Sequence, residues 1–209
     1  MYNENEKIFE SKDKLILLER CMERLGVPWG KIYRKSLIQN NNLKFVPNLK
    51  RMQDSIFNLY VFNASNKTMH INECVYDYRQ FNESSCYKYS KDIDITAKKI
   101  LDCIMEFMNI NNLNNCFKEA YYVKAIKLII EVVKLKYTQD KKEKKYFEKI
   151  SEIKKLVKSQ PYSEAIKYCN YKKLNNNYKI GYFLIRFKLI NLLYLYYKLI
   201  SIWKKVINF

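Results

Sequence analysis

Glycine is the residue whose scarcity most constrains this chain, because only 3 glycines occur among its 209 residues. Prolines are equally few, at 3. Glycine supplies the left-handed backbone of tight turns and the loops that cradle phosphates. The composition therefore leaves little room for tight turns or nucleotide-binding glycine loops. With 48% hydrophobic and 29% charged residues, the chain is still expected to be globular.

Positive charge is concentrated in the second half of the chain. The net charge is +18 overall. Residues 1–90 contain 14 Lys and Arg against 10 Asp and Glu, whereas residues 91–209 contain 25 against 11. This asymmetry indicates an anionic partner, either a phospholipid surface or nucleic acid. We place a domain boundary near residue 90, between 1–90 and a basic helical region, 91–209.

The cysteines favour a reduced compartment. None of the 6 belongs to a Cys-x-x-Cys pair, and His70 is the single histidine. We therefore expect free thiols that act as small hydrophobic side chains in the cytoplasm, and no structural zinc site. The acidic and polar N-terminus lacks the pattern of a secretory signal.

Apolar periodicity predicts a mixed α/β fold that is predominantly helical. The first helix is expected to use Ser11 as its N-cap and Gly26 as its C′ residue. From Asp92 onward every periodic segment is helical, and two of the helices flank Pro161. In the first half we expect helices at 12–25, 34–40 and 55–63, an extended segment at 29–33, and strands at 67–72 and 75–80.

Three short motifs in the first half carry side chains suited to chemistry. They are Trp29-Gly30-Lys31, Gln53-Asp54 and Tyr76-x-Tyr78-Arg79. Each also has an ordinary structural interpretation. Asp54 can be the N-cap of helix 55–63, Trp29 can be a core residue beside a surface Lys31, and Arg79 can be exposed at a strand end.

Taken in order, these motifs resemble the acceptor-side half of a family-2 glycosyltransferase of the GT-A fold. The resemblance runs from Val27 to Tyr89 and includes Asn42-Leu43-Lys44-Phe45 and Asn82-Glu83-Ser84 between and after the motifs. It implies a partial GT-A-like α/β half, followed by a C-terminal helical region. The nucleotide-binding half of the family is not recognisable, since the 26 residues before Val27 are expected to form a single helix.

The resemblance implies inverting transfer of a sugar from a nucleotide-sugar donor to a glycan or lipid-linked acceptor. Asp54 is implied as the general base that takes the proton of the acceptor hydroxyl. Trp29 would stack on a sugar face, Lys31 would reach a phosphate, and Arg79 would contact the diphosphate or the acceptor. The family usually has Glu-Asp where this chain has Gln53-Asp54.

A divalent metal, Mn²⁺ or Mg²⁺, is expected for the whole family domain, but we place none of its ligands in this chain. Asp92-Ile93-Asp94 spells the Asp-x-Asp metal motif, yet it follows Asp54 by 38 positions and opens a helix, so helix capping explains it. We therefore expect the chain alone to be inactive. The resemblance leaves two alternatives open, a truncated or split reading frame and one part of a two-chain enzyme whose other chain carries the nucleotide-binding half.

The end of the chain, from Tyr182 to Phe209, predicts one amphipathic helix. No run of about 18 uncharged residues exists there, so a membrane-spanning helix is not expected. The pattern is typical of a helix lying on an anionic leaflet, here the inner face of the cell membrane; packing on the other helices is the alternative. The predicted apolar arc comprises Ile185, Leu189, Leu192, Leu193, Tyr196, Leu199, Ile200, Trp203 and Val206.

A second function remains open on the same sequence. The chain can be a basic helical protein that binds nucleic acid or a membrane surface without catalysis. Nucleic-acid binding explains the charge but not the ordered motifs between Val27 and Tyr89, so it is the less favoured interpretation. A third is a helical adaptor with no activity.

Overall fold

The structure is a computed structural model that describes residues 7–23, 25–77, 79, 89–140 and 144–207, with side chains described up to Trp203. Its contacts divide the chain into two compact units. The first comprises Met1–Phe81 and Asp102–Phe117, and the second comprises Asn82–Leu101 and Lys118–Phe209. Helix α4 (Ile93–Ile110) contributes to both units.

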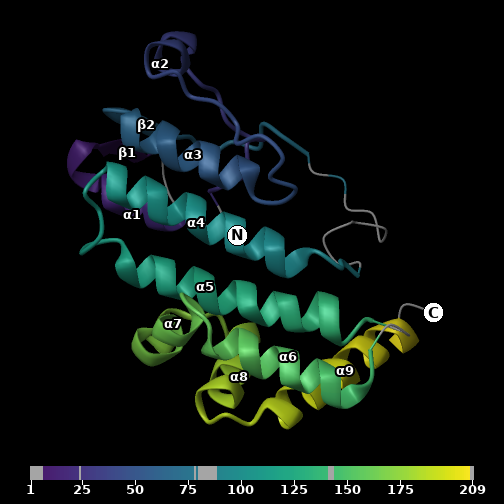
Figure 1. Cartoon of the computed structure of the whole chain (residues 1–209). Coiled ribbons are helices and arrows are strands. Elements are labelled where there is room, and N and C mark those ends of the chain that lie inside the picture. Colours follow the sequence, from purple (N-terminus) through teal and green to yellow (C-terminus); the bar gives the residue numbers. More distant parts are fainter. Residues whose placement is uncertain (1–6, 24, 78, 80–88, 141–143, 208–209) are drawn as a thin grey trace. The chain divides into compact units, whose positions relative to one another are not determined.

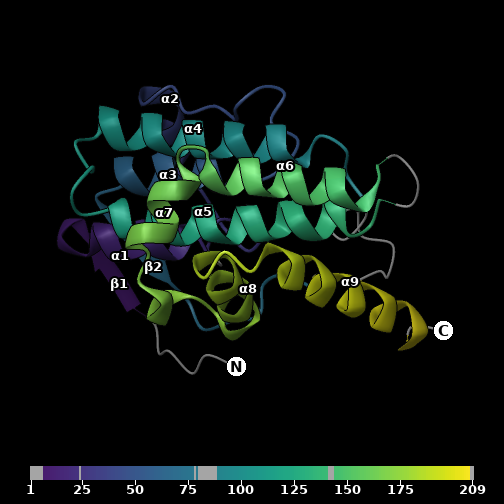
Figure 2. The same cartoon turned by 60° about the horizontal axis from the view of Figure 1, so that its bottom comes forward.

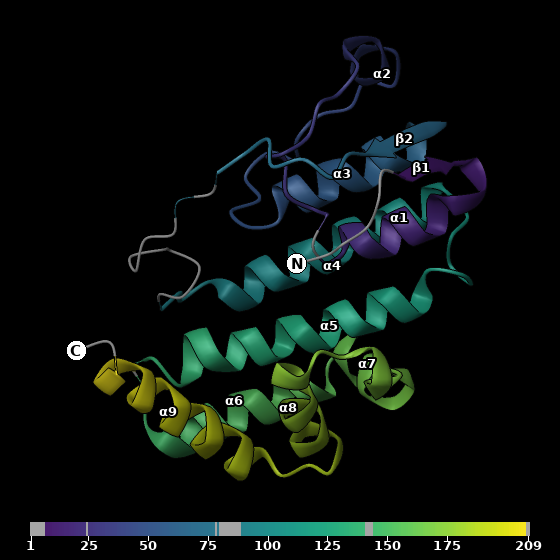
Figure 3. The same cartoon turned by 180° about the vertical axis from the view of Figure 1, so that it is seen from behind.

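A small antiparallel sheet and three helices form most of the first unit (Figures 1 and 3). Strand β1 (Lys7–Glu10) pairs with β2 (Lys67–His70), with Lys7 opposite His70 and Glu10 opposite Lys67. A 3-10 turn, Ser11–Asp13, leads into the first helix. The helices are α1 (Lys14–Cys21), α2 (Lys35–Asn40) and α3 (Gln53–Ala64).

The core of the first unit lies between α1 and α3. Leu17, Leu18 and Cys21 on α1 are buried, as are Ile56 and Leu59 on α3. The part of α4 in this unit adds Phe107, whose ring meets Tyr60 edge-to-face at 5.0 Å between centroids. Burial of this apolar surface holds the two helices and the sheet together.

Three predictions about the first unit are wrong. The single helix expected before Val27 is instead strand β1, a 3-10 turn and a short α1, because residues 7–10 pair with β2. Helix α1 is capped by Met22, four residues before the expected Gly26. The strand expected at 75–80 is irregular at Val75–Asp77, while Tyr78 and Gln80 lie outside the described residues.

Helix α5 (Lys118–Val132) is the centre of the second unit (Figure 2). Nine of its 15 residues are buried, on more than half of its circumference. It continues into a π-helical turn, Val133–Tyr137. Around it and beside it lie α6 (Tyr146–Lys158), α7 (Tyr162–Tyr168), a 3-10 turn at Tyr171–Lys173, α8 (Asn176–Arg186) and α9 (Ile190–Ile207).

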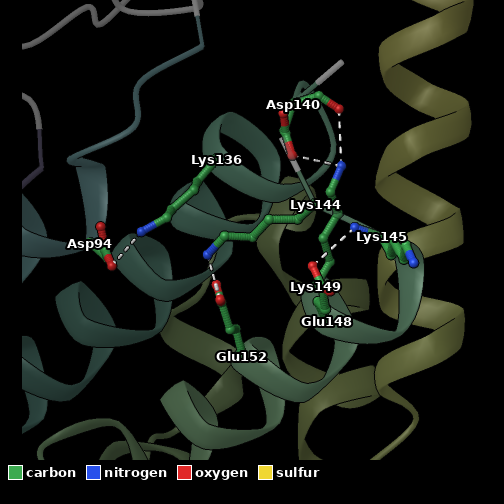
Figure 4. A network of polar contacts seen from close by, with 8 residues as sticks. All are labelled: Asp94, Lys136, Asp140, Lys144, Lys145, Glu148, Lys149 and Glu152. Atoms are coloured by element: carbon green, nitrogen blue, oxygen red, sulfur yellow. Dashed lines mark hydrogen bonds and ion pairs between the residues drawn. The ribbon is translucent and has the colours of Figure 1, made fainter. Parts of the chain in front are cut away.

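Ion pairs tie the π-helical turn and the start of α6 to their surroundings (Figure 4). The ammonium of Lys149 lies 2.8 Å from Asp140 Oδ2 and also donates to the Asp140 carbonyl at 3.0 Å. Both side chains are buried. Lys136 lies 2.6 Å from Asp94, and Lys144 pairs with Glu152. The Asp92-Ile93-Asp94 segment thus starts α4 and forms an ion pair within this unit.

The predicted single helix from Tyr182 to the C-terminus is wrong, because the chain turns between α8 and α9. Helix α8 ends at Arg186, Lys188 adopts a left-handed φ of 59°, and α9 begins at Ile190. Arg186 donates to the Ile166 carbonyl at 3.0 Å and so fixes the end of α8. The turn allows both helices to bury an apolar face, with Ile185 on α8 and Leu193 on α9.

Gly181 marks the closest approach of α8 to its neighbours. A Cβ built there would lie within 3 Å of the Tyr197 hydroxyl and of Ile130 Cδ1. The hydroxyl of Tyr197 is buried and has no hydrogen-bond partner among the described residues, and burial raises its pKa. The packing at this point therefore depends on the missing side chain of Gly181.

We predict that Gly181→Ala lowers the free energy of unfolding by about 2 kcal/mol, since overpacking displaces α9 or α5. The loss should be smaller in a Tyr197→Phe background, because the nearest atom has been removed. Urea unfolding of the four proteins of this double-mutant cycle measures the coupling. Equal losses in the two backgrounds would contradict the proposed contact.

Candidate functional site

Asp54 lies in the first turn of α3, and it is not the N-cap. The helix begins at Gln53, and its N-cap is Met52, which adopts a left-handed φ of 58°. Asp54 Oδ1 accepts a hydrogen bond from the backbone N–H of Ser55 at 2.8 Å. The helix N-terminus and this N–H both favour a negative charge here. The alternative interpretation of Asp54 as the cap of helix 55–63 is therefore wrong, whereas its role as a base stays a prediction.

The amide of Asn58 fastens the preceding loop to this helix. Asn58 is fully buried, and its Nδ2 donates to the Gly26 carbonyl at 2.8 Å and to the Asp54 carbonyl at 3.1 Å. Its Oδ1 accepts from the Tyr33 hydroxyl at 2.8 Å. One side chain thereby holds the beginning and the end of the 26–33 segment against the first turns of α3.

Close backbone packing completes the attachment of the loop. A Cβ on Gly26 would lie within 3 Å of Ser55 Cβ and of the Cys21 carbonyl oxygen. The thiol of Cys21 donates to the Ser55 carbonyl at 3.4 Å. Gly26 is thus required for close approach and not for ending α1. The loop and the N-terminal end of α3 form one packed element.

Lys31 is attached to its own loop. Its side chain is half-buried and its ammonium donates to the Val27 carbonyl. Burial lowers the pKa of Lys31 from its ordinary value of 10.5, while the negative charges of the Cys21 thiolate and, less strongly, of the Asp54 carboxylate oppose the shift. The charge of Asp54 therefore acts on Lys31, although the two side chains form no ion pair among the described contacts.

Trp29 and Tyr76 form an exposed aromatic pair. Their ring centroids are 6.5 Å apart with 25° between the ring planes, and the residues are 38% and 51% exposed. The alternative interpretation of Trp29 as a core residue is therefore wrong. Gly30 has a φ of 66° with open space around it, which suits a left-handed turn between Trp29 and Lys31. A flat ligand can stack on such a pair.

Arg79 is exposed, as its alternative interpretation expected, although it lies on no described strand. Among the described residues it makes no recorded contact with Trp29, Lys31 or Asp54. It shares the segment that follows β2 with Tyr76, which lies beside Trp29. The structure thus places Trp29 and Lys31 on a loop that Asn58 attaches to the helix of Asp54, and no described contact joins Arg79 to these three residues.

Two features of the site were not found from the sequence. The first feature is Asn58. Asparagine is abundant throughout this chain, so a single asparagine does not stand out in the sequence. The rings of Tyr33, Phe45 and Phe57 form a cluster, with Phe45 and Phe57 stacked at 4.3 Å and Tyr33 edge-on to Phe57 at 5.9 Å. For Asn58, the signal that could have indicated its role is its spacing: it follows Asp54 by four residues and so lies on the same side of the helix.

No group of three or more His, Cys, Asp or Glu side chains that could hold a metal ion occurs among the described residues. The residues around Asp54 include no second carboxylate in the first turn of α3.

Comparisons with known proteins identify no relative. No protein-family model, no curated protein and no solved structure matches the chain.

We predict that Asn58→Leu lowers the free energy of unfolding by about 3 kcal/mol, because it removes the bonds to Gly26, Asp54 and Tyr33 and leaves buried polar groups without partners. Asn41→Leu is the control, since Asn41 is exposed and bonds only within its own helix end. Chemical unfolding measures both. Equal effects of the two changes would contradict the role of Asn58.

Lys31 should make stability depend on alkaline pH. Its pKa is lower in the folded chain than in the unfolded chain, so between the two values the unfolded chain binds more protons. The free energy of unfolding should therefore rise as pH increases toward 10.5. Lys31→Arg should lack this component, because arginine stays charged throughout the range. Urea unfolding across this range measures the difference, and parallel curves would contradict the prediction.

Proposed function

We propose that residues 26–79 form the acceptor side of a sugar-transfer site, with Asp54 as the general base. The observation that supports the proposal is the attachment of the 26–33 loop, which carries Trp29 and Lys31, to the first turns of α3, which carry Asp54, through Asn58. The charge of Asp54 also acts on Lys31, since it opposes the lowering of the Lys31 pKa. The exposed Trp29 ring lies two residues from Lys31 on the same loop. A carboxylate, a cation and a stacking surface are the groups that binding and deprotonating a sugar hydroxyl require.

The proposed step is a single displacement. Asp54 accepts the proton of an acceptor hydroxyl while the hydroxyl oxygen forms a bond to the anomeric carbon of the donor sugar. The bond between that carbon and the nucleoside diphosphate breaks, and its electron pair leaves with the diphosphate. Since Oδ1 of Asp54 accepts from the Ser55 N–H, Oδ2 is the oxygen we assign to the acceptor hydroxyl.

The remaining side chains would bind and orient. Trp29 and Tyr76 present an apolar surface on which the acceptor sugar would stack. Lys31 would attract a phosphate of a lipid-linked acceptor or of the leaving diphosphate, and its partial burial strengthens that attraction. Arg79 would contact the diphosphate or the acceptor if the segment after β2 brought its guanidinium to the site.

The donor would be held elsewhere. Among the described residues the only sheet has two antiparallel strands, which differs from the parallel sheet that binds nucleotides in α/β folds. We therefore propose that the nucleotide-sugar donor is bound by a nucleotide-binding half on another segment or another chain. That half would also supply the ligands of any divalent metal.

We predict that Asp54→Asn lowers the transfer rate by about 10²–10⁴-fold, the usual contribution of a general base. The assay measures sugar transfer and donor hydrolysis across a panel of nucleotide sugars. The full chain is tested alone and mixed with a polypeptide that carries the nucleotide-binding half of a family-2 enzyme. Asp102→Asn is the matched control, because Asp102 is an exposed carboxylate on α4.

The expected result is transfer only in the mixture, lost in Asp54→Asn and kept in Asp102→Asn. Equal activity of the two variants would contradict the role of Asp54 as general base.

Acceptor binding gives a second measurement that needs no donor-binding half. The chain has 2 tryptophans, so a Trp203→Phe variant leaves Trp29 as the only one. The fluorescence of Trp29 should change when a glycoside that resembles the acceptor is added. The proposal would be overturned if no glycoside changed the fluorescence and no sugar transfer was detected.

A further inference from the structure

Helix α9 carries a row of exposed apolar side chains that the fold does not use. We call Leu192, Leu195, Leu199, Ile202 and Trp203 the outer stripe. Their exposed fractions lie between 47% and 65%. Their spacing of three and four residues puts them on one side of the helix. A continuous apolar stripe of this kind indicates an interaction surface, whereas single exposed apolar residues do not.

The opposite face of α9 is fixed against the rest of the second unit (Figure 2). Ile190, Leu193, Tyr194 and Tyr197 on that face are buried. The ammonium of Lys198 donates to the Thr138 carbonyl at 2.9 Å, and Asn191 accepts from the Tyr146 hydroxyl at 3.2 Å. Because the buried face and the edge that carries Asn191 and Lys198 are both attached, the outer stripe cannot turn inward without breaking these contacts.

The structure also corrects which residues of α9 face outward. The sequence pattern grouped Leu192, Leu193 and Tyr196 on one apolar arc, but Leu193 is buried and Leu192 is exposed. The helix is apolar on two opposite faces, one in the core and one outside. Periodicity alone cannot assign such a helix to a single face.

The part of the chain that follows Glu164, which includes α8 and α9, has charged side chains of one sign only. Glu164 is the last acidic residue of the chain, and 9 Lys and Arg follow it. Lys188, which begins the turn before α9, is exposed. No carboxylate on α8 or α9 would therefore repel an anionic surface that contacted the stripe.

We propose that the outer stripe of α9 docks on an anionic lipid surface. The helix would lie in the plane of the interface, with its leucines and Ile202 inserted about 5–10 Å into the boundary between headgroups and acyl chains. The indole of Trp203 suits the headgroup level, since it combines an apolar ring with an N–H donor. The cations of the last 45 residues would attract the anionic headgroups. This inference does not rest on sugar transfer.

Other occupants fit the same observations less well. A second copy of the chain would bring an equally basic α9 against the first, and the like charges would repel. Nucleic acid is bound mainly through cations on its contact face, whereas this face presents leucine, isoleucine and tryptophan. No helix in the described part of the chain is long and apolar enough to cross a membrane.

The test is binding of the full chain to vesicles, measured by flotation. Vesicles of phosphatidylcholine alone are compared with an equal mixture of phosphatidylcholine and phosphatidylglycerol. We expect binding about tenfold or more stronger to the anionic vesicles, weakening as salt is added. The double variant Leu199→Glu with Ile202→Glu should lose at least about tenfold of that binding.

A matched control separates the stripe from general charge and hydrophobicity. Ile32→Glu with Ile110→Glu changes the net charge by the same amount and removes two apolar side chains of the first unit, which are 100% and 63% exposed. It should keep most of the binding. A Trp29→Phe variant leaves Trp203 as a reporter in the otherwise unaltered chain, and its emission should shift to the blue and be quenched by brominated lipids.

Three results would overturn the proposal. The first is equal binding of the stripe and control variants, or an unshifted Trp203 emission with vesicles present. The second is absent vesicle binding together with a dimer, seen by sedimentation, that the stripe variant dissociates. The third is tight binding of an oligonucleotide that the stripe variant loses while vesicles do not bind. The Trp203 readout decides the question even if the stripe variant does not fold.

Discussion

The buried amide of Asn58 is the interaction on which the first unit depends. Its four polar contacts join Gly26, Val27 and Asp54 through their carbonyls and Tyr33 through its hydroxyl. A buried amide without partners would cost several kcal/mol, so the segments that satisfy it are bound to one another by the same requirement. The 26–33 loop contains no described helix or strand, and the amide of Asn58 binds both of its ends to α3.

The scarcity of glycine proved less restrictive than its count suggested. Left-handed backbone occurs at Asn42, Asn48 and Asn112, and asparagine is the residue that tolerates this conformation best after glycine. Two of the 3 glycines are used where no side chain can fit. Gly26 and Gly181 lie where a Cβ would collide with a neighbour, and Gly30 combines a left-handed turn with open space.

Local patterns predicted most helices but not the features set by distant contacts. The helix around Ile56 to Phe62 and the helices that flank Pro161 follow from apolar spacing, and the structure confirms them. Strand β1 could not be found in this way, because its stability comes from pairing with residues 60 positions away. The turn at Lys188 was missed for a related reason, since continuous apolar spacing hides a break that only the packing of α8 and α9 requires.

At the candidate site, too, the sequence indicated which residues have suitable side chains but not the contacts that position them. Trp29, Lys31 and Asp54 could be named from the sequence, but the attachment of the loop of Trp29 and Lys31 to the helix of Asp54 depends on Asn58 and Gly26, which carry no chemical signal. Gln53 adds a further point. A carboxylate at that position would compete with Asp54 for the N–H groups of the first turn and would repel it. With a neutral Gln53, Asp54 is the one acid in the first turn, so the positive end of the helix dipole acts on one carboxylate alone.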